Sequence, residues 1–434
     1  MPCGRRLKHA ASRSDPCGCH VLAWHPIADG SRCVLRDFFR NHVFERFPLF
    51  SGICLGVAQA FLLAWGLALH EGGLAAVPFG WLMLVLVVLA LANGWLLPRL
   101  GLTQPASYSL ALLERAYLAI GFGTIVIAGV IGAFALVFVL GIPLLAFAGV
   151  SDTAAFTLFR TGSVAFAAIA TAALCHGVWI APRRLEVTQI RVAIPGLDLK
   201  LRGLRIAHLS DLHIGNGLEG ARLAGIVDRT NAIEADLVVL TGDLFDHDPR
   251  FLDAGAAALA RLRARLGVFA VLGNHDWMTG TEAVAAALAP HAPRVVLLRD
   301  AWAKLFTDAP LYVAGAEDPG RDWTENGQGL PAIDALAAEM PVDGPRILLV
   351  HRPDAFPQAT QRGFALTLSG HFHGGQIAFP FAGGRWNVAR ALTPFPRGAY
   401  RMQDAHLYVS RGLGFAGPRI RFGSDPEITV LELA

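Results

Sequence analysis

Eight polar side chains in the second half of the chain have the types and spacing of metal ligands and acid–base groups. Seven carry oxygen or nitrogen donors and closely follow short apolar runs: Asp211, His213, Asp243, Asn274, His351, His371 and His373. The eighth, His275, directly follows Asn274. Seven donors exceed the roughly four that one zinc ion uses, whereas two divalent ions about 3.5–4 Å apart would use them all. We therefore predict a dinuclear metal site.

The stretch Ser369–Gly375 reads SGHFHGG and places two imidazoles two residues apart. On an extended segment His371 and His373 can each reach a different ion, and the flanking glycines permit the close backbone approach that this needs. One carboxylate must lie between the ions, because a bridging anion screens their mutual repulsion. The donors include no thiolate, which indicates Mn, Fe, Zn or Co rather than copper(I) or an iron–sulfur cluster.

Five short apolar runs must position these donors. They read LRIAHL, ADLVVL, GVFAVL, RILLV and FALTL, and each ends just before a donor. Continuous apolar runs of this length are typical of strands covered on both faces. Helical patterns over Gly220–Ile233 and Asp253–Leu266 lie between some of them. Alternating strands and helices indicate an α/β layer architecture, in which polar chemistry gathers at the carboxyl ends of the strands.

Five sequence blocks in this order resemble a known family. They read Asp211-x-His213, Gly242-Asp243, Gly273-Asn274-His275-Asp276, His351 and Gly370-His371-x-His373. A single histidine or Asp-x-His pair is a weak signal, but the full set is similar to the calcineurin-like metallophosphoesterases from roughly Leu201 to the C-terminus. The stretches LSGHFHGGQIAFP and LYVSRGLGFAGPRIRFGSDPEI resemble the membrane-associated bacterial branch. That branch includes phosphodiesterases and UDP-2,3-diacylglucosamine pyrophosphatases of lipid A synthesis.

The resemblance implies an α/β/β/α sandwich of two mixed sheets and a role for each donor. One metal would be held by Asp211, His213 and His373, and the other by Asn274, His351 and His371. Asp243 would bridge them. His275 would face the phosphate and protonate the leaving oxygen, with Asp246 as its candidate partner, while Asp276 could accept hydrogen bonds behind the ligands. The branch usually has Thr where this chain has Phe372, which leaves substrate preference open.

The first half of the chain is apolar to a degree that indicates a membrane domain. Charged residues make up only 16% of the chain, against about 25% in ordinary soluble proteins. Four apolar runs, each at least about 20 residues and so long enough to cross a bilayer, cover Pro48–Leu69, Leu74–Leu97, Tyr117–Ala148 and Ala154–Ala181. A soluble domain has nowhere to bury four such runs. We predict a basic, poorly ordered tail over 1–47, a four-helix transmembrane domain over 48–181 and a phosphoesterase domain over 182–434.

Arginines in alternate connections predict the orientation of these helices. Cytoplasmic connections are enriched in Lys and Arg. The basic segments precede the first run, separate the second from the third and follow the fourth: Arg36, Arg40, Arg46, Arg99, Arg115, Arg183 and Arg184. We therefore expect a multi-pass protein of the inner (plasma) membrane with both termini cytoplasmic.

These observations predict hydrolysis of a phosphodiester or pyrophosphate bond by metal-activated water. At a membrane, a lipid-linked or nucleotide-linked cell-envelope substrate is the nearest organic phosphate, and Phe379, Phe381 and Trp386 are candidates to meet acyl chains or simply to fill the core. Several arginines keep a membrane-tethered protein phosphatase or nuclease as alternatives: Arg346, Arg352, Arg385, Arg390, Arg397 and Arg401. A transporter or sensor with a regulatory domain is a further alternative, although the runs carry few of the ionisable residues that transport needs. The net charge of +3 is too small to predict a specific nucleic-acid partner.

Overall fold

The computed structural model describes most of the 434-residue chain. The described residues are 22–23, 47–71, 81, 84–93, 108–246, 248–291, 294–306, 308–320, 329–379 and 386–434. The predicted tail over 1–47 lies outside them, apart from the short strand β1 (Leu22–Ala23) and the first residue of α2.

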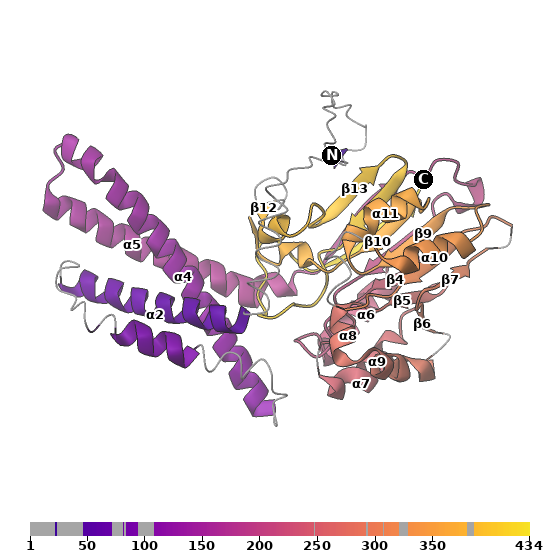
Figure 1. The fold of residues 1–434 in the computed structure, drawn as a ribbon, viewed down its shortest axis with the longest axis horizontal. Coiled ribbons are helices and arrows are strands. Elements are labelled where there is room, and N and C mark those ends of the chain that lie inside the picture. Colours follow the sequence, from indigo (N-terminus) through magenta and orange to yellow (C-terminus); the bar gives the residue numbers. More distant parts are fainter. Residues whose placement is uncertain are drawn as a thin grey trace, which may run out of the picture.

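Three long helices project away from the α/β part of the chain: α2 (Phe47–Glu71), α4 (Tyr108–Phe147) and α5 (Asp152–Cys175) (Figure 1). The rings of Phe134 in α4 and Phe159 in α5 stack with centroids 5.9 Å apart. Gly162 lets the two helices approach, because a Cβ there would overlap the Phe134 ring. After α5 the chain continues through a π-helical turn (His176–Ile180) and a 3₁₀ turn (Ala181–Arg183) into the first sheet.

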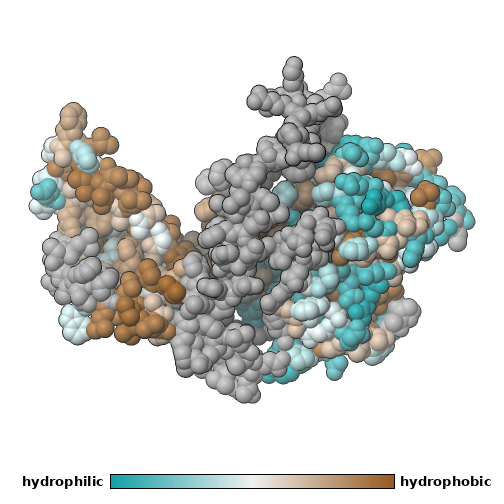
Figure 2. Space-filling view, viewed as in Figure 1, coloured by the Kyte–Doolittle hydropathy of each residue, from teal (hydrophilic) through white to brown (hydrophobic). Residues whose placement is uncertain are grey.

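Two helical stretches among the described residues are long and apolar enough to cross a membrane. They are Ile120–Phe147 and Asp152–Arg183, and in an apolar 18-residue stretch of each only 11% and 17% of the residues are buried within the protein. Their outward faces are apolar, and Phe147 at the end of α4 is 94% exposed (Figure 2). The other two predicted spans contain shorter apolar helices, Ile53–Leu69 and Leu84–Asn93, and the rest of the second lies outside the described residues. Four spans therefore remain a prediction.

The first sheet of the α/β domain has the strand order β2-β15-β3-β4-β5-β6. The strands β3 to β6 are parallel, whereas β15 runs antiparallel to β3 and parallel to β2. Their bounds are β2 (Glu186–Val192), β3 (Arg205–Leu209), β4 (Leu237–Thr241), β5 (Val268–Val271), β6 (Val296–Leu297) and β15 (Glu427–Leu433).

The second sheet has the order β1-β13-β14-β10-β9-β8-β7 and is also mixed. Its core, β8, β9, β10 and β14, is parallel. β7 runs antiparallel to β8, and β13 runs antiparallel to β14 and parallel to β1. The bounds are β7 (Ala301–Lys304), β8 (Tyr312–Ala316), β9 (Arg346–Val350), β10 (Leu366–Ser369), β13 (Gly398–Met402) and β14 (Ala405–Val409). A separate ribbon pairs β11 (Ala378–Phe379) with β12 (Trp386–Asn387).

The two sheets pack face to face, and helices cover both outer faces. Because side chains alternate along a strand, Val239 of β4 points between the sheets while Leu240 points to the helical layer. The first sheet is covered by α6 (Gly220–Asn231), α7 (Leu252–Leu259), α8 (Asn274–Thr279) and α9 (Thr281–Leu288). The second is covered by α10 (Pro331–Glu339) and α11 (Phe356–Gln361). The predicted α/β fold with two mixed sheets is confirmed.

One predicted helix is shorter than expected. The pattern over Asp253–Leu266 predicts a helix, but α7 ends at Leu259. The following segment is held in an irregular conformation by Asn231, whose amide donates to the Arg261 carbonyl (2.9 Å) and accepts from the Arg263 N–H (2.8 Å). These bonds compete with helix continuation and return the chain to β5.

Candidate metal centre

Five loops at the carboxyl ends of β3, β4, β5, β9 and β10 carry the predicted donors. In the first sheet, Asp211 and His213 follow β3, Asp243 follows β4, and Asn274 opens α8 after β5. In the second sheet, His351 follows β9, and the loop after β10 carries His371 and His373. The site therefore lies where the ends of the two sheets meet. Six of the seven predicted donors fall in clusters of possible metal ligands there, and Asn274 is the residue before His275, whose N–H donates to Asp243.

Asp211, His213 and His373 form the first donor group, with ligand atoms all within 4.8 Å of one another. The Nε2 atoms of the two histidines are 3.0 Å apart. The His373 Nε2 lies 3.5 Å from the Asp211 Oδ1. Two imidazole nitrogens at this distance need a proton or a cation between them, and a carboxylate alongside suits a cation.

Asp243, His351 and His371 form the second donor group. The His351 Nε2 lies 3.2 Å from the Asp243 Oδ2 and 3.1 Å from the His371 Nδ1. Behind it, the His351 Nδ1 lies 2.8 Å from the Thr241 carbonyl oxygen. Since a carbonyl can only accept, Nδ1 carries a hydrogen, and Nε2 of a neutral ring is left free to bind a metal.

Asp243 lies between the two groups. Its Oδ2 is 3.5 Å from the His213 Nε2 and 3.2 Å from the His351 Nε2. Its Oδ1 accepts the backbone N–H of His275 at 2.8 Å, which fixes the carboxylate plane. A single carboxylate shared by both groups has the placement that a bridging ligand needs.

Two buried oxygens at the site support the presence of cations. The Asp211 Oδ2 and the Asn274 Oδ1 are inaccessible to solvent and have no hydrogen-bond partner among the described residues. Burying a polar atom without a partner is costly, so such atoms are rare unless an ion or water satisfies them. The donor set fits two divalent metal ions without a thiolate.

Backbone strain is concentrated at the same residues. Five of the seven donors are non-glycine residues with positive φ: Asp211 (51°), His213 (45°), Asp243 (51°), His371 (75°) and His373 (50°). This left-handed region is uncommon for residues other than glycine, although Asp and His adopt it more readily than most, and strained conformations cluster at functional sites. Gly370 is required for a different reason, because a Cβ there would overlap Ser210 and the Asp211 carboxylate.

The electrostatics favour the ligating forms of His371, His373 and Asp243, but not of every donor. Burial, together with the nearby charges of Arg352 and His351, holds the pKa of His371 well below its usual range. Burial, His213 and Arg421 do the same to the pKa of His373. Burial alone would raise the pKa of Asp243, but the surrounding histidines outweigh it and hold that pKa well below normal. Neutral imidazoles and an ionised carboxylate are the forms that bind metal. Burial would lower the pKa of His351, but Asp243 and Asp211 outweigh it and raise that pKa to about 10, and burial raises the pKa of Asp211. A metal ion bound at these two residues would take the place of the proton.

His275 lies beside the donors and pairs with Asp246. The His275 Nδ1 is 2.8 Å from the Asp246 Oδ1, which also lies 3.4 Å from the His213 Nδ1. Burial would lower the pKa of His275, but the charges of Asp243 and Asp246 outweigh burial and raise it. The geometry thus brings together both residues predicted for proton transfer.

Asp276 is buried behind the site and accepts three backbone hydrogen bonds. Its donors are the N–H groups of Leu244 (3.1 Å), Phe245 (2.9 Å) and Gly273 (2.9 Å). These bonds connect the loop that carries Asp243 to the loop that carries Asn274. Asp276 thus accepts hydrogen bonds behind the predicted ligands, as expected from the sequence.

Two residues near the site were not singled out from the sequence. Thr241 orients His351 through its carbonyl, and Arg421 is fully buried against His373. A carbonyl contact leaves no residue-type signal, and a buried arginine looks like any other in the sequence. The unusual Phe372 packs its ring edge-on against His371, with centroids 4.7 Å apart.

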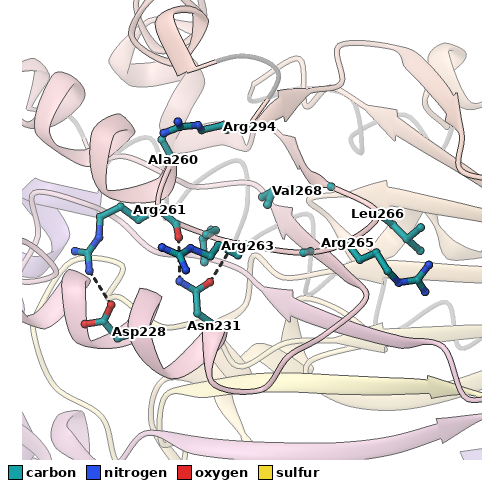
Figure 3. Close-up of a pocket in the computed structure, with 12 residues that line it drawn as sticks. Asp228, Asn231, Ala260, Arg261, Arg263, Arg265, Leu266, Val268 and Arg294 are labelled. Atoms are coloured by element: carbon teal, nitrogen blue, oxygen red, sulfur yellow. Dashed lines mark hydrogen bonds and ion pairs between the residues drawn. The ribbon is translucent and has the colours of Figure 1, made fainter.

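A hollow of about 1010 Å³ lies at the edge of the first sheet that is opposite the metal donors (Figure 3). It is lined by the end of α6 and the segment that leads into β5. Its arginines do not converge: Arg261 points to Asp228 (2.7 Å), and Arg265 points the other way and pairs with Asp236 (2.8 Å). Because this edge carries the amino ends of the parallel strands, the hollow is remote from the metal donors.

Comparison with known proteins agrees with this geometry. Residues 204–375 match the family model described as calcineurin-like phosphoesterase. A Danio rerio protein named transmembrane protein with metallophosphoesterase domain is 31% identical over 362 residues, which cover 81% of this chain and 80% of that protein. An uncharacterized metallophosphoesterase of Campylobacter jejuni is 32% identical over 57% of this chain and 63% of its own length, and one of Bacillus subtilis is 29% identical over 62% and 94%. The chain therefore belongs to the calcineurin-like metallophosphoesterases, hydrolases of phosphoric esters that use two divalent metal ions.

Proposed function

We propose that this protein is a membrane-anchored phosphoesterase that hydrolyses a phosphodiester or pyrophosphate bond in a lipid-linked or nucleotide-linked cell-envelope substrate. The observation that carries the proposal is the direct connection between apolar, outward-facing helices and the domain that holds the metal donors. An exposed aromatic side chain lies between the two. In this proposal the helices contact membrane lipids. The substrate is a phosphate ester at the bilayer surface.

The helices have features typical of a bundle in lipid. Small residues allow close packing: a Cβ on Gly56 of α2 would overlap the backbone of Ala90 in the neighbouring apolar helix. The Asn93 side chain donates to the Gln59 side chain across the same contact (2.8 Å). Small residues and interhelical polar bonds are the usual means of association in membranes, where burial of apolar surface gives no driving force. This supports the inclusion of the two shorter apolar helices in a four-span arrangement.

The end of α5 has the residues of a membrane–water boundary. Trp179 is exposed in the π-helical turn, and Arg183 and Arg184 follow within five positions and are exposed. Aromatic rings favour the interface and arginines favour the cytoplasmic side. The boundary would then lie at this turn, with the α/β domain and the C-terminus on the cytoplasmic side. With four spans the N-terminus would lie on the same cytoplasmic side of the inner (plasma) membrane.

The segment after the metal ligands points to a lipid-linked substrate. Phe379 of β11 is 57% exposed and lies six positions after His373. The adjacent Ala378 N–H donates to the Phe422 carbonyl (2.7 Å), and the Phe422 ring is 6.4 Å from the ring of His176 at the end of α5. An exposed aromatic ring between the metal centre and the end of a membrane helix is suited to contact an acyl chain. The side chains of Phe381 and Trp386 lie outside the described part of the chain.

The chemistry follows from the placement of His275. When bound, the two ions supply positive charge for the phosphate oxygens and lower the pKa of a shared water. Water gives up one proton to the solvent, its oxygen adds to phosphorus as hydroxide, and the bond to the leaving oxygen breaks. The raised pKa of His275 keeps its imidazole protonated, with Nδ1 held by Asp246, so that Nε2 can give a proton to the leaving oxygen. No side-chain nucleophile is needed.

The alternative of a nuclease or protein phosphatase needs a basic groove beside the site. Arg346 instead donates to the Arg362 carbonyl (2.7 Å), and Arg352 is buried on Asp318 (2.6 Å). Arg401 pairs with Asp404 at 3.3 Å. These three arginines are held by partners within the protein. Arg385 lies outside the described residues. We therefore propose no specific nucleic-acid partner.

The test is a comparison of substrates by the full chain in detergent with Mn²⁺. The panel contains p-nitrophenyl phosphate, bis-p-nitrophenyl phosphate, a nucleotide-linked diacyl sugar and the same sugar without its acyl chains. We expect cleavage of the diester and of the acylated pyrophosphate, with a lower KM for the acylated than for the deacylated sugar. Cleavage of the monoester alone would contradict the proposal.

A matched pair of variants separates a lipid contact from general damage. Phe379→Ser removes the exposed ring beside the centre, and Val342→Ser removes an apolar side chain that is 83% exposed after α10. We expect Phe379→Ser to raise KM for the acylated substrate and to leave bis-p-nitrophenyl phosphate turnover unchanged, while Val342→Ser changes neither. Equal KM values for all three proteins would contradict the role of Phe379.

A further inference from the structure

Arg421 is a buried arginine whose side chain is held by carbonyls. It is fully buried, and its guanidinium donates to the carbonyls of Gly414 (2.6 Å), Arg411 (2.9 Å) and Ser424 (2.9 Å). Among the described residues, no carboxylate lies within ion-pair distance of it. Burying a charge is costly unless it is well bonded, so this arrangement requires a reason beyond packing.

The guanidinium lies against a metal ligand. The Arg421 Nη2 is 3.4 Å from the His373 Nδ1, on the side of the ring opposite the Nε2 that faces Asp211 and His213. The same segment also holds the backbone of this ligand, because the Ser424 hydroxyl donates to the His373 carbonyl (2.8 Å). The segment Arg421–Ser424 therefore holds His373 at two points, the ring through Arg421 and the backbone through Ser424.

The guanidinium also braces the loop that carries the other ligands of this group. Its acceptor Gly414 donates its own N–H to the Asp211 carbonyl (2.7 Å), and a Cβ on Gly414 would overlap Leu212. One side chain therefore connects the loop of Asp211 and His213 with the loop of His373. These three residues are the first donor group, and the second group has no contact of this kind with Arg421.

The backbone of Arg421 is joined to the end of the membrane helix. Its N–H donates to the Gly177 carbonyl (3.0 Å) in the π-helical turn that follows α5. A Cβ on Gly177 would lie 2.9 Å from the Arg421 carbonyl oxygen and 2.9 Å from Ile420 Cγ1, so any larger residue must displace this segment. π-Helical turns are frequent at functional sites.

We propose that Arg421 is a positioning residue for the metal site of Asp211, His213 and His373, and that Gly177 sets its place from the membrane helix. The membrane anchor is then part of the support of one metal site rather than a tether alone. The other site, of Asn274, His351 and His371, is supported through Thr241 and Asp276 and is independent of the anchor. This inference does not depend on which phosphate ester is cleaved.

The test is a Mn²⁺ titration of the metal-stripped full chain in detergent, followed by calorimetry and by electron paramagnetic resonance, without substrate. The variants are Arg421→Lys and Ser424→Ala, with Arg419→Lys as the matched control from the same loop. Loss of a residue that orients a metal ligand typically lowers affinity about 10- to 100-fold. We expect Arg421→Lys to weaken one of two Mn²⁺ sites by that factor, Ser424→Ala to weaken the same site less, and Arg419→Lys to change neither.

Gly177→Ala tests the link to the helix without touching a buried charge, so it guards against the case in which Arg421→Lys fails to fold. Its control is Gly129→Ala in α4, where a Cβ meets nothing within 4 Å. We expect Gly177→Ala to weaken the same single site and Gly129→Ala to leave both unchanged. Wild-type affinity at both sites in Gly177→Ala and Ser424→Ala, or equal weakening of both sites, would overturn the proposal.

Discussion

Leu140 and Leu240 are the same type of residue in opposite surroundings. Leu240 of β4 is fully buried beneath the helices of the α/β domain, whereas Leu140 of α4 is 70% exposed. In the domain, apolar side chains turn inward because water drives them there. In the helical region many apolar side chains turn outward, and the contacts between helices include small residues and the Asn93–Gln59 pair as well as stacked phenylalanines. This contrast is the one that the proposed membrane anchor predicts, with lipid around the helices and water around the domain that holds the metal donors.

The largest effect should come from the carboxylate shared by the two donor groups. Asp243→Ala removes the group that lies between the histidines of both sites, so we expect no measurable phosphodiesterase activity and loss of at least one bound ion. Far-ultraviolet circular dichroism should remain that of the wild type. The control is Asp253→Ala, an exposed carboxylate of α7. Wild-type turnover by Asp243→Ala would contradict the assignment of the active site to these donors.

His275→Ala should lower activity without removing metal. A positioned acid contributes about 10²–10⁴-fold to rate, and we expect kcat for bis-p-nitrophenyl phosphate to fall by that factor. The ion content, measured by elemental analysis, should be unchanged because His275 stands beside the donors. The control His291→Ala lies outside the site. A parallel loss of both ions would mean that His275 is a ligand instead.

Leu140→Lys tests the helical region. A lysine costs about 2.5–3.5 kcal/mol at the centre of a membrane helix and less toward its ends, where Leu140 lies, whereas an exposed substitution in water changes stability by only about 0.5 kcal/mol. We expect the variant to insert poorly, as measured by the fraction that resists alkaline extraction from membranes. The matched substitution Val342→Lys on the aqueous domain should not alter that fraction. Equal extraction of both would show that α4 does not face lipid.

Asp246→Asn should shift the pH dependence rather than abolish activity. The acid form of His275 is active, and its raised pKa extends that form to higher pH; kcat then falls as pH rises through that pKa. Removing the charge of Asp246 lowers the pKa of His275, so the alkaline limb of the kcat profile should move to lower pH. A profile that keeps its alkaline limb in place would contradict the pairing of these two residues.

The smallest effect is expected at the hollow on the opposite edge of the first sheet. Arg263→Ala changes one of its lining residues, far from the donors. We expect kcat/KM for every substrate in the panel to stay at the wild-type value. A change in kcat/KM would mean that this edge takes part in substrate binding.

The parts of the fold that followed from the sequence are those determined by local pattern. The runs that became β3, β4, β5, β9 and β10 are largely apolar, and each is followed within three residues by a donor. The position of a side chain just past a parallel strand is set by the sheet itself, so the donors could be expected to meet.

The remaining parts depend on contacts between distant segments. β15 lies between β2 and β3, with Leu431 opposite both Ile190 and Ile206, and nothing local in the sequence specifies that pairing. The burial of Arg421 likewise depends on a loop whose shape brings three carbonyls together. The early end of α7 arises from Asn231 on another helix. Such features require the fold to be known first.

The most direct test is to count and place the metal ions in the folded, full-length protein. Elemental analysis after saturation with Mn²⁺, followed by an anomalous difference map at the Mn absorption edge, measures both. We expect two ions per chain, about 3.5–4 Å apart, with the Asp243 carboxylate between them. A single ion, no ion, or two ions placed away from these seven donors would contradict a dinuclear phosphoesterase.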